Sequence, residues 1–487
     1  MGHARKDSLF VRTSLVRTLA GYGLMLLGAV ALFAVVRSYG EGLVAPAPLP
    51  GAPPAGTTPA HPHTFAQVLL ALAVIVVAAR AVGALFERVL RQPPVMGEIV
   101  AGLALGPSVL GAISSDAYAF LLPPAIAPHL GIVAKIGVVL FMFLVGLELD
   151  PRPLQRNTHA TLAISHASIV APFALGTTLA LALYPVYSSS AVSFTVFALF
   201  LGVSMSVTAF PVLARILTDR RLQSTPLGVT ALACAAVDDA TAWCLLAVVS
   251  GVATAQMGDA GWTIGLVAAY LVAMFVVVRP IARWLSAREE QRAAERPVST
   301  TVLALVFAML LVSAWATEAI GIHALFGAFV LGALIPHDGR LADQLRARME
   351  DLVLVLLVPL FFAFTGMRTQ IGLVSSTQDW LFLAVIVGVA TLGKFGGSFV
   401  AARLSGMSVR ESSALGILMN TRGLMELIVL NVGLDMGVLS PTLFTMLVLM
   451  ALATTFATTP VLSVLMRGRG LADAPSAPRV PSSARLE

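Results

Sequence analysis

The chain has 487 residues, of which 58% are hydrophobic and only 11% are charged. A soluble protein of this size could not bury so much apolar surface, so the composition predicts a polytopic membrane protein. The net charge of +6 does not indicate nucleic-acid binding, because the basic residues lie in short segments between apolar runs, where they orient membrane helices.

The first apolar run extends from Arg17 to Arg37, after a basic N-terminal stretch. It is longer than the apolar part of a signal peptide, and no small-residue cleavage site follows it. We therefore expect a retained membrane helix. The Pro/Ala/Gly-rich segment that follows is expected to be an extramembranous linker, so that residues 1–63 form an N-terminal unit.

Further apolar segments follow, and together with the first they predict an all-α protein with about 14 transmembrane helices. Placing the N-terminus in the cytoplasm leaves most Lys and Arg residues on the cytoplasmic side and returns the basic C-terminal tail there. The expected centres of these later segments are Ile75, Leu103, Val139, Ala171, Gly202, Asp239, Ala273, Ala308, Gly327, Pro359, Gly393, Gly423 and Ala453.

Two pairs of motifs indicate an internal repeat. The third segment reads GEIVAGLALGP from Gly97, and the tenth reads GIHALFGAFVLGALIP from Gly321. The fourth contains FMFLVG, ending at Gly146, and the eleventh contains FFAFTG, ending at Gly366. Both pairs are seven helices apart, and an odd offset inverts the topology. Inverted repeats are common in secondary transporters.

Two segments at equivalent positions of this repeat carry polar interruptions, which predict two discontinuous helices that cross. Non-helical backbone at membrane depth is tolerated only within protein or beside a wet cavity. The sixth segment, SMSVTAFPVLARIL, contains Ser204, Ser206, Thr208 and Pro211. The thirteenth, MNTRGLMELIVL, contains Asn420, Thr421, Arg422 and Gly423. The alternative is that each helix is kinked but continuous.

The seventh segment holds two adjacent acids, Asp238 and Asp239, near its middle. Ionisable residues at this depth are rare and mark ion or proton pathways. Lys394 lies at a matching depth in the twelfth segment and is the expected counter-ion. Adjacent helical residues point about 100° apart, so one carboxylate should face the site and the other a flank. The alternative is an acidic pair neutralised by a basic residue without a transport role.

Six ordered motifs resemble the monovalent cation:proton antiporter-2 family, which includes bacterial Na+/H+ exchangers, plant cation/H+ exchangers and potassium-efflux antiporters. The resemblance covers residues 64–466 and leaves the first helix and the linker outside. The motifs are GEIVAGLALGPSVLG, FLVGLELD, VTAFPVLARIL, VDDATAWCLLA, GAFVLGALIP and NTRGLMELIVLNVG.

The resemblance implies a homodimer in which a mobile core carries the ion past a fixed scaffold in an elevator motion. The implied scaffold is formed by residues 64–150 and 298–372, and the core by residues 151–256 and 373–466. A connecting helix and cytoplasmic loop would occupy residues 257–297, and a cytoplasmic tail residues 467–487.

The resemblance also implies the roles of the site residues. Asp239 would coordinate the monovalent cation, Asp238 would bind protons or tune the site, and Lys394 would pair with the aspartate when no cation is bound. Thr208 and Ser206 would complete the site at the first broken helix. The expected support for the broken helices comes from Pro211, Asn420, Thr421, Arg422, Gly423 and Glu426. Arg422 and Glu426 are four residues apart and are expected to pair with each other or with partners across the crossing.

The function predicted from the residues and the resemblance is exchange of a monovalent cation, Na+ rather than K+, for protons in a bacterial cell membrane. More than one proton per cation is the family expectation; no cofactor and no enzymatic activity are expected. One alternative is a K+/H+ efflux antiporter gated by a separate subunit, since no GxGxxG nucleotide motif follows Met466. Another is a cation channel, which Lys394 would oppose. An intramembrane aspartyl protease is disfavoured, because its carboxylates must converge from two elements.

Overall fold

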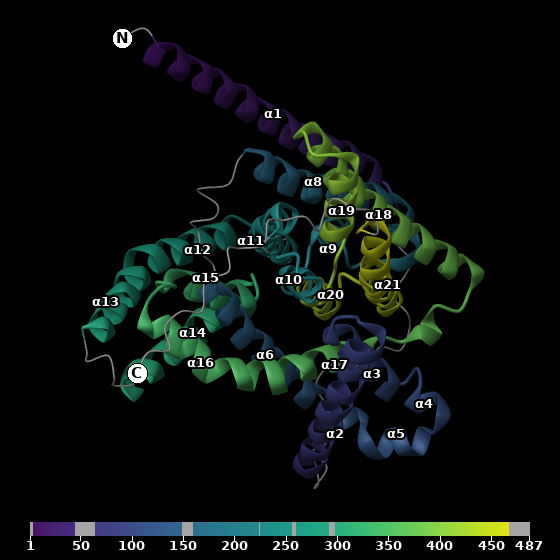
Figure 1. Cartoon of the computed structure of the whole chain (residues 1–487). Helices are drawn as coiled ribbons and strands as arrows, with labels where there is room; N and C mark the ends of the chain where they lie inside the picture. The colour runs from purple at the N-terminus through teal and green to yellow at the C-terminus, as the bar shows by residue number, and fades with distance from the viewer. Residues whose placement is uncertain are drawn as a thin grey trace, which may run out of the picture.

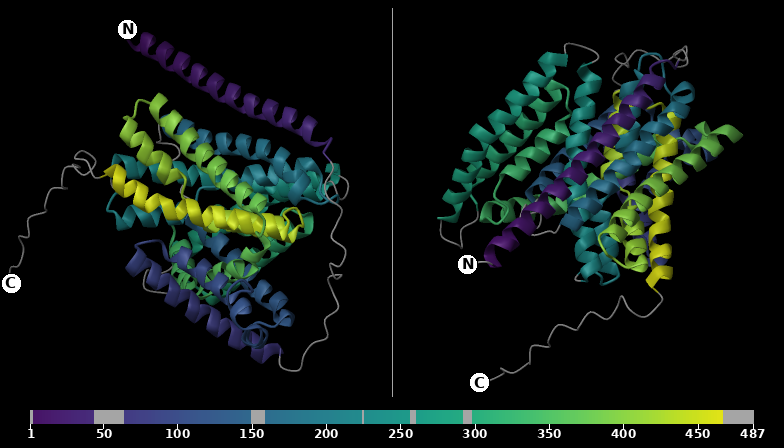
Figure 2. Two further views of the ribbon diagram at one scale, coloured as in Figure 1. Left: turned by 90° about the vertical axis from the view of Figure 1, so that its right-hand side faces the viewer. Right: turned by 90° about the horizontal axis from the view of Figure 1, so that it is seen from above.

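The computed structural model describes residues 3–43, 64–148, 159–223, 225–255, 260–291 and 298–466, and all regular secondary structure within them is helical. The helices form one bundle, in which α9, α10 and α20 lie at the centre and α1 runs along the outside (Figures 1 and 2). The expected linker and cytoplasmic tail, and part of the expected cytoplasmic loop, lie outside the described residues.

The first half of the chain holds the N-terminal helix, the predicted first scaffold unit and the predicted first core unit. The helices are α1 (His3–Gly40), α2 (Thr64–Leu85), η1 (Phe86–Leu90), α3 (Pro94–Leu105), α4 (Leu110–Ile113), α5 (Ser115–Leu121), η2 (Pro124–Ile126), α6 (Ala127–Glu148), α8 (His159–Tyr187), α9 (Phe194–Ser206), α10 (Phe210–Asp219) and α11 (Pro226–Ala255).

The second half holds the predicted connector, second scaffold unit and second core unit. Its helices are α12 (Ala260–Ala273), η3 (Met274–Val278), α13 (Arg279–Glu290), α14 (Thr300–Ile320), α15 (Ala324–Leu334), α16 (Arg340–Leu352), η4 (Val353–Leu357), α17 (Val358–Arg368), η5 (Ile371–Leu373), α18 (Thr377–Leu404), α19 (Val409–Met419), α20 (Leu424–Asp435) and α21 (Pro441–Met466).

Among the described residues, 12 helical spans are long and apolar enough to cross a membrane, and 13 if the bent pair α19–α20 counts as one span. In chain order, the 12 spans, the bent pair and the shorter apolar helix α15 correspond to the expected segments, about 14 in all. The tenth expected segment forms only α15, whose 11 residues extend about 16 Å, roughly half a bilayer core. It is short because Gly321 (φ 95°) and His323 (φ 72°) end the helical path between α14 and α15.

The internal repeat is visible in equivalent helix contacts. In the aligned motifs Gly102 corresponds to Gly332, and Ala363 to Phe143. A Cβ on Gly102 would lie 1.9 Å from the Ala363 carbonyl oxygen, and a Cβ on Gly332 would lie 2.3 Å from that of Phe143. The α3–α17 and α15–α6 pairs therefore use corresponding glycines for close backbone approach. The two halves repeat the same packing, as the motif offset predicts.

The two predicted interruptions are present, and they meet. α9 ends at Ser206 and α10 begins at Phe210, while α19 ends at Met419 and α20 begins at Leu424. The backbone N–H of Ala209 in the first break donates to the Thr421 carbonyl in the second, at 3.0 Å. All residues of α9 except Leu199, and nearly every residue of α20, are buried, so these breaks lie inside protein rather than against lipid.

Candidate ion-binding site

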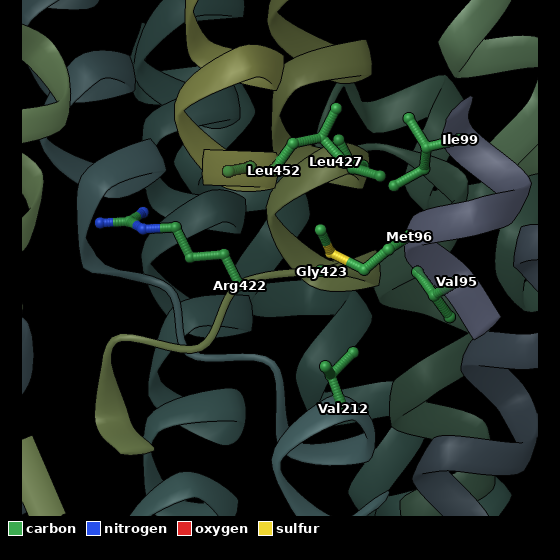
Figure 3. A pocket seen from close by; sticks show the side chains of 9 residues that line it. Val95, Met96, Ile99, Val212, Arg422, Gly423, Leu427 and Leu452 are labelled. Atoms are coloured by element: carbon green, nitrogen blue, oxygen red, sulfur yellow. The ribbon is translucent and has the colours of Figure 1, made fainter. Parts of the chain in front are cut away.

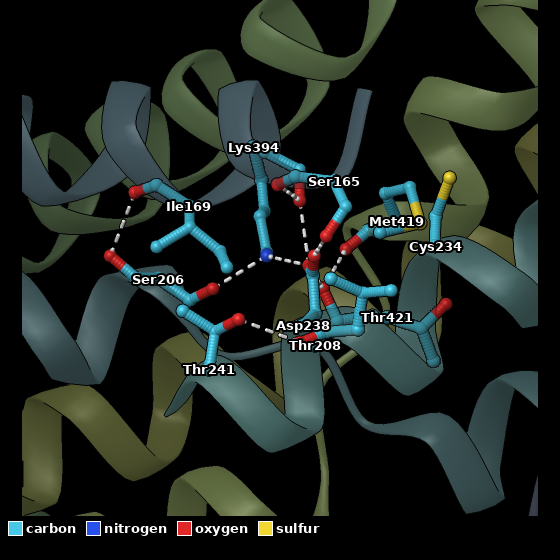
Figure 4. Close-up of polar contacts among 12 residues, drawn as sticks. Ser165, Ile169, Ser206, Thr208, Cys234, Asp238, Thr241, Lys394, Met419 and Thr421 are labelled. Atoms are coloured by element: carbon cyan, nitrogen blue, oxygen red, sulfur yellow. Dashed lines mark hydrogen bonds and ion pairs between the residues drawn. The ribbon is translucent and has the colours of Figure 1, made fainter. Parts of the chain in front are cut away.

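Asp238 lies on α11 beside the meeting point of the two breaks and is fully buried. Its Oδ1 accepts a hydrogen bond from the Ser165 hydroxyl at 2.5 Å. Its Oδ2 accepts from the hydroxyls of Ser168 at 2.6 Å and Thr208 at 2.8 Å. Figure 4 shows these groups converging on the carboxylate from α8 and from the first break. These donors, together with the basic partner described next, occupy the hydrogen-bonding capacity of both carboxylate oxygens.

Lys394 supplies the opposite charge from α18. Its Nζ lies 2.9 Å from Asp238 Oδ2 and donates to the Ser206 carbonyl at 2.5 Å, and both charged side chains are fully buried (Figure 4). Two neighbouring glycines allow this position. A Cβ on Gly393 would lie 2.7 Å from Pro172 Cα, and one on Gly397 would lie 2.5 Å from the Ala167 carbonyl. α18 can therefore pack closely on α8 and deliver the amine to the site.

Asp239 has different surroundings, although it is the next residue on the helix. It is 7% exposed, and the Phe210 backbone N–H at the start of α10 is a hydrogen-bond partner. Its Oδ1 is buried and has no hydrogen-bond partner in the described part of the chain. Lys394 therefore forms its ion pair with the first carboxylate of the pair, Asp238, and Asp239 keeps unused acceptor capacity.

The remaining residues predicted at the first break divide into two groups. Thr208 Oγ1 contacts both Asp238 and the Met419 carbonyl, at 3.2 Å from the latter, and so links the site to the second break. The Ser206 hydroxyl instead donates to the Gly202 carbonyl at 2.7 Å and lies 3.1 Å from that of Ile169, so only its backbone carbonyl reaches Lys394. Pro211 lies in the first turn of α10, where a missing N–H costs no helical hydrogen bond.

The residues predicted at the second break mainly support its backbone. The Thr421 hydroxyl donates to the Leu418 carbonyl at 2.6 Å. Asn420 caps α19, and its buried Oδ1 has no partner among the described residues. Gly423 precedes α20 in extended conformation, and a Cβ there would lie 2.7 Å from Val212 of α10.

Arg422 neutralises the carbonyl end of α9. Its guanidinium donates to the carbonyls of Ser204 at 3.1 Å and Met205 at 3.0 Å, which lie in the last turn of that helix. Nη1 also lies 3.1 Å from Glu426 Oε1, so the predicted pair forms within the membrane-buried protein. Because carbonyls at a helix C-terminus carry partial negative charge, this contact stabilises the broken helix. Glu426 contacts Arg422 and is not among the groups that contact Asp238.

On the other side of Gly423, apolar side chains close the contact between α3 and the broken helices. Val95, Met96 and Ile99 of α3 face Val212 and Leu427 around a cavity of about 10 Å³, at the lower limit for one water. Figure 3 shows Arg422 extending away from these residues. The contact between α3 and the broken helices is therefore apolar and leaves room for about one water at most.

Ser165 and Ser168 were not predicted as site residues, although together they supply two of the donors to Asp238. Hydroxyls three residues apart lie on one face of a helix. A serine pair within an apolar span could therefore have indicated polar contacts to the acidic pair. The sequence, SHASIV, contains that pair.

Interrupted membrane helices that meet beside a buried carboxylate and a buried amine are the construction of secondary transporters. Residues 68–468 match the family described as "Sodium/hydrogen exchanger, transmembrane". The chain belongs to this family, as its motifs predicted, and it is a multi-pass membrane protein.

Curated relatives support the assignment. The chain is 43% identical over 401 residues to "Na(+)/H(+) antiporter NhaS4" of Synechocystis, covering 82% of this chain and 97% of that protein. It is 41% identical to "Cation/H(+) antiporter 20" of Arabidopsis thaliana, over 84% of this chain, and spans 50% of that relative's length. It is 34% identical to "K(+)/H(+) antiporter 1" of Saccharomyces cerevisiae, over 76% of this chain and 43% of the relative.

A solved structure has the same fold. The sodium proton antiporter MjNhaP1 of Methanocaldococcus jannaschii superposes with a TM-score of 0.58 over 82% of this chain and 98% of that one. The two sequences are 15% identical, so this likeness concerns the fold.

Proposed function

We propose that this protein exchanges a monovalent cation for protons across a bacterial cell membrane, and that the exchange occurs at Asp239. The observation that carries the proposal is the contrast between the two aspartates. Asp238 is saturated by three hydroxyls and Lys394, whereas Asp239 Oδ1 is buried and lacks a partner within the described residues. A carboxylate with a free acceptor can take either a proton or a cation.

Charge balance explains why the two ions would alternate. With the Lys394–Asp238 pair intact, a proton or a monovalent cation on Asp239 makes the site neutral. The same site with neither ligand carries one negative charge, which is costly to move through a low-dielectric barrier. If only the neutral forms cross the membrane, each inward proton is matched by an outward cation.

Lys394 provides for a second proton. If the arriving cation also contacts Asp238, it displaces the Lys394 ammonium, and a buried amine without its counter-ion releases its proton. Cation binding would then release two protons, one from Asp239 and one from Lys394. This second scheme replaces the one-for-one exchange above, because the cation-loaded site now crosses with one net negative charge. Exchange is then electrogenic, since two protons enter for each cation that leaves.

The wider arrangement follows the family expectations. We propose that the protein is a homodimer with both termini in the cytoplasm, and that α8–α11 and α18–α21 move as a core against the scaffold helices. The 43%-identical relative is a Na+/H+ antiporter by name, which favours Na+. The yeast relative is a K+/H+ antiporter by name and supports K+ as the second candidate.

The experiment uses purified protein in proteoliposomes with an imposed pH gradient and a lumenal pH dye. Na+, Li+, K+ and Rb+ are added in turn to wild type, Asp239→Asn and Asp116→Asn. Asp116 is an exposed acid in the first turn of α5, so it controls for the same chemical change away from the site. We expect Na+ to dissipate the gradient with wild type and Asp116→Asn but not with Asp239→Asn.

Two results would overturn the proposal. Equal activity of Asp239→Asn and wild type would give the acidic pair a structural role only. Cation movement without proton movement, or unitary conductance in planar bilayers, would favour the channel alternative.

A further inference from the structure

The N-terminal helix α1 is anchored to neighbouring helices near the two ends of its apolar part. At one end the Tyr22 hydroxyl donates to the His159 carbonyl at 2.9 Å, and its ring packs on His166. At the other end a Cβ on Gly40 would lie 2.0 Å from the Phe194 ring, and Val36 is only 3% exposed. Most side chains between these contacts are exposed. Between the two ends the Phe33 ring lies 6.4 Å from that of Phe173, measured between centroids, and otherwise the helix is sparsely packed.

A cavity of about 290 Å³ occupies this middle region, between α1 and helices α8, α9 and α11. Its walls include Leu26, Ala29, Val30 and Phe33 of α1, with Val170 and Phe173 of α8 opposite. An engineered apolar cavity of about 150 Å³ stays dry and binds benzene. This cavity is about twice as large, its lining is apolar apart from His166 and Thr241, and water is therefore a poor occupant.

The cavity opens toward the lipid. Leu26 and Val30 line it and are also 49% and 64% exposed, so its mouth lies on the outer surface of the bundle. Its wall residues fall in the middle of spans that cross the membrane, Ala20–Gly40 and His159–Tyr187. The surrounding solvent at that depth is acyl chain, which matches the lining in chemistry.

α1 is also an addition to the family fold, because the family match begins at residue 68. Without α1, this face of α8 would contact the bilayer directly. With α1 attached at its ends, a lipid chain on that face would be enclosed between the added helix and the core.

We propose that α1 and α8 form a binding site for one acyl chain of a membrane phospholipid, retained as part of the folded protein. The site adjoins the back of the ion-binding residues. His166 lies between Ser165 and Ser168, Thr241 is two residues beyond Asp239, and the Ile169 carbonyl accepts from Ser206. A bound chain would exclude water from that side and keep the Asp238–Lys394 pair in a low-dielectric environment. The inference does not depend on which ion is exchanged.

The test uses the full chain in vesicles of palmitoyl-oleoyl phosphatidylethanolamine and phosphatidylglycerol, with a trace of phosphatidylglycerol bearing a mid-chain diazirine. After irradiation, or after extraction and gel filtration without irradiation, mass spectrometry locates cross-links and counts retained lipids. For wild type we expect one retained phospholipid and cross-links to the 26–33 and 170–173 segments together.

Ala29→Trp fills the cavity from α1, and Val170→Trp fills it from α8. Leu24→Trp, at a position 75% exposed on α1, makes a comparable change outside the cavity and serves as the control. We expect both cavity-filling variants to lose the retained lipid and the cross-links, while the control keeps them. Two cavity-filling variants keep the test valid if one of them fails to fold.

Absence of a retained phospholipid in wild type, retention of a fatty acid instead, or equal retention in all folded variants would overturn the proposal. Because no arm measures transport, failure here leaves the proposed exchange untouched.

Discussion

Asp238 and Asp239 are chemically identical neighbours, yet the protein surrounds them with different groups. Asp238 receives hydroxyls from α8 and from the first break, and the ammonium of Lys394, whereas Asp239 keeps a buried oxygen without a partner among the described residues. In the proposed mechanism, Asp238 is part of the framework and Asp239 takes the exchangeable ion. Substitutions around Asp238 should therefore change stability, and those at Asp239 should change exchange.

Lys394→Met should strongly destabilise the protein, because it leaves Asp238 buried without its counter-ion. Removing one partner of a buried ion pair costs about 3–5 kcal/mol. The double variant Asp238→Asn/Lys394→Met should unfold at a higher temperature than Lys394→Met alone, since no buried charge is left unpaired. Thermal unfolding in detergent measures the stability of the single and the double variant. A double variant no more stable than the single one would show that the ion pair is not what the lysine stabilises.

Ser165→Ala and Ser168→Ala should each lower the free energy of unfolding by about 1.5–3 kcal/mol, the range for hydrogen bonds to charged groups. Ser413→Ala is the matched control, because within the described part of the chain that hydroxyl bonds only the Val409 carbonyl of its own helix. Denaturant unfolding of the three variants supplies the comparison. Equal losses in all three would mean that the α8 hydroxyls do not act through Asp238.

At the scale of elements, corresponding glycines hold corresponding helix pairs together. Gly102 on α3 touches the backbone of α17, and Gly332 on α15 touches that of α6. These contacts leave no room for a methyl group, whereas Gly388 on α18 has no neighbouring atom within 4 Å of its Cβ position.

Gly102→Ala and Gly332→Ala should therefore both lower the unfolding temperature, because each new Cβ would meet a backbone carbonyl. Gly388→Ala should leave it unchanged or raise it, since alanine is favoured over glycine in helices by about 1 kcal/mol. The measurement is thermal unfolding of the three single variants. Similar behaviour of all three would argue against close packing at the repeat-related contacts.

The elements also show what could be predicted from the sequence. Charged residues and polar interruptions stand out in a mostly apolar sequence. Asp238, Asp239, Lys394 and both helix breaks could therefore be predicted from the sequence. The choice of Asp238 as the partner of Lys394 depends on how α11 is rotated, which packing against α8 and α18 decides. The Ser165/Ser168 pair was overlooked because hydroxyls carry no charge. The apolar pattern of the tenth segment does not reveal that α15 is only 11 residues long, because the pattern continues past the backbone break at Gly321 and His323.

At the scale of the whole molecule, ion pairs join the proposed core to the proposed scaffold. Asp435, at the end of α20, lies 2.8 Å from Lys135 of α6 and 2.7 Å from Arg368 of α17. Arg368 also donates to Asn431, at 2.9 Å. If α20 moves past α6 and α17 during exchange, these contacts must break in each cycle.

Asp435→Asn should consequently speed hydrogen–deuterium exchange in the last turn of α20, because α20 loses its ion pairs with Lys135 and Arg368. Asp219→Asn is the control, since Asp219 ends α10 but pairs with Arg215 of the same helix. Exchange followed by mass spectrometry compares the variants. Unchanged protection of α20 in Asp435→Asn would mean that these pairs do not restrain the core.

The central claim, that cation and proton movements are obligatorily coupled at one site, is tested most directly by isotope uptake. Proteoliposomes holding wild type or Asp239→Asn are given an acidic lumen, and ²²Na+ is supplied outside. Obligatory coupling predicts that wild type accumulates ²²Na+ above its external concentration. A protonophore should abolish this accumulation, and Asp239→Asn should not show it. Uptake that only equilibrates the isotope, with or without the pH gradient, would contradict it.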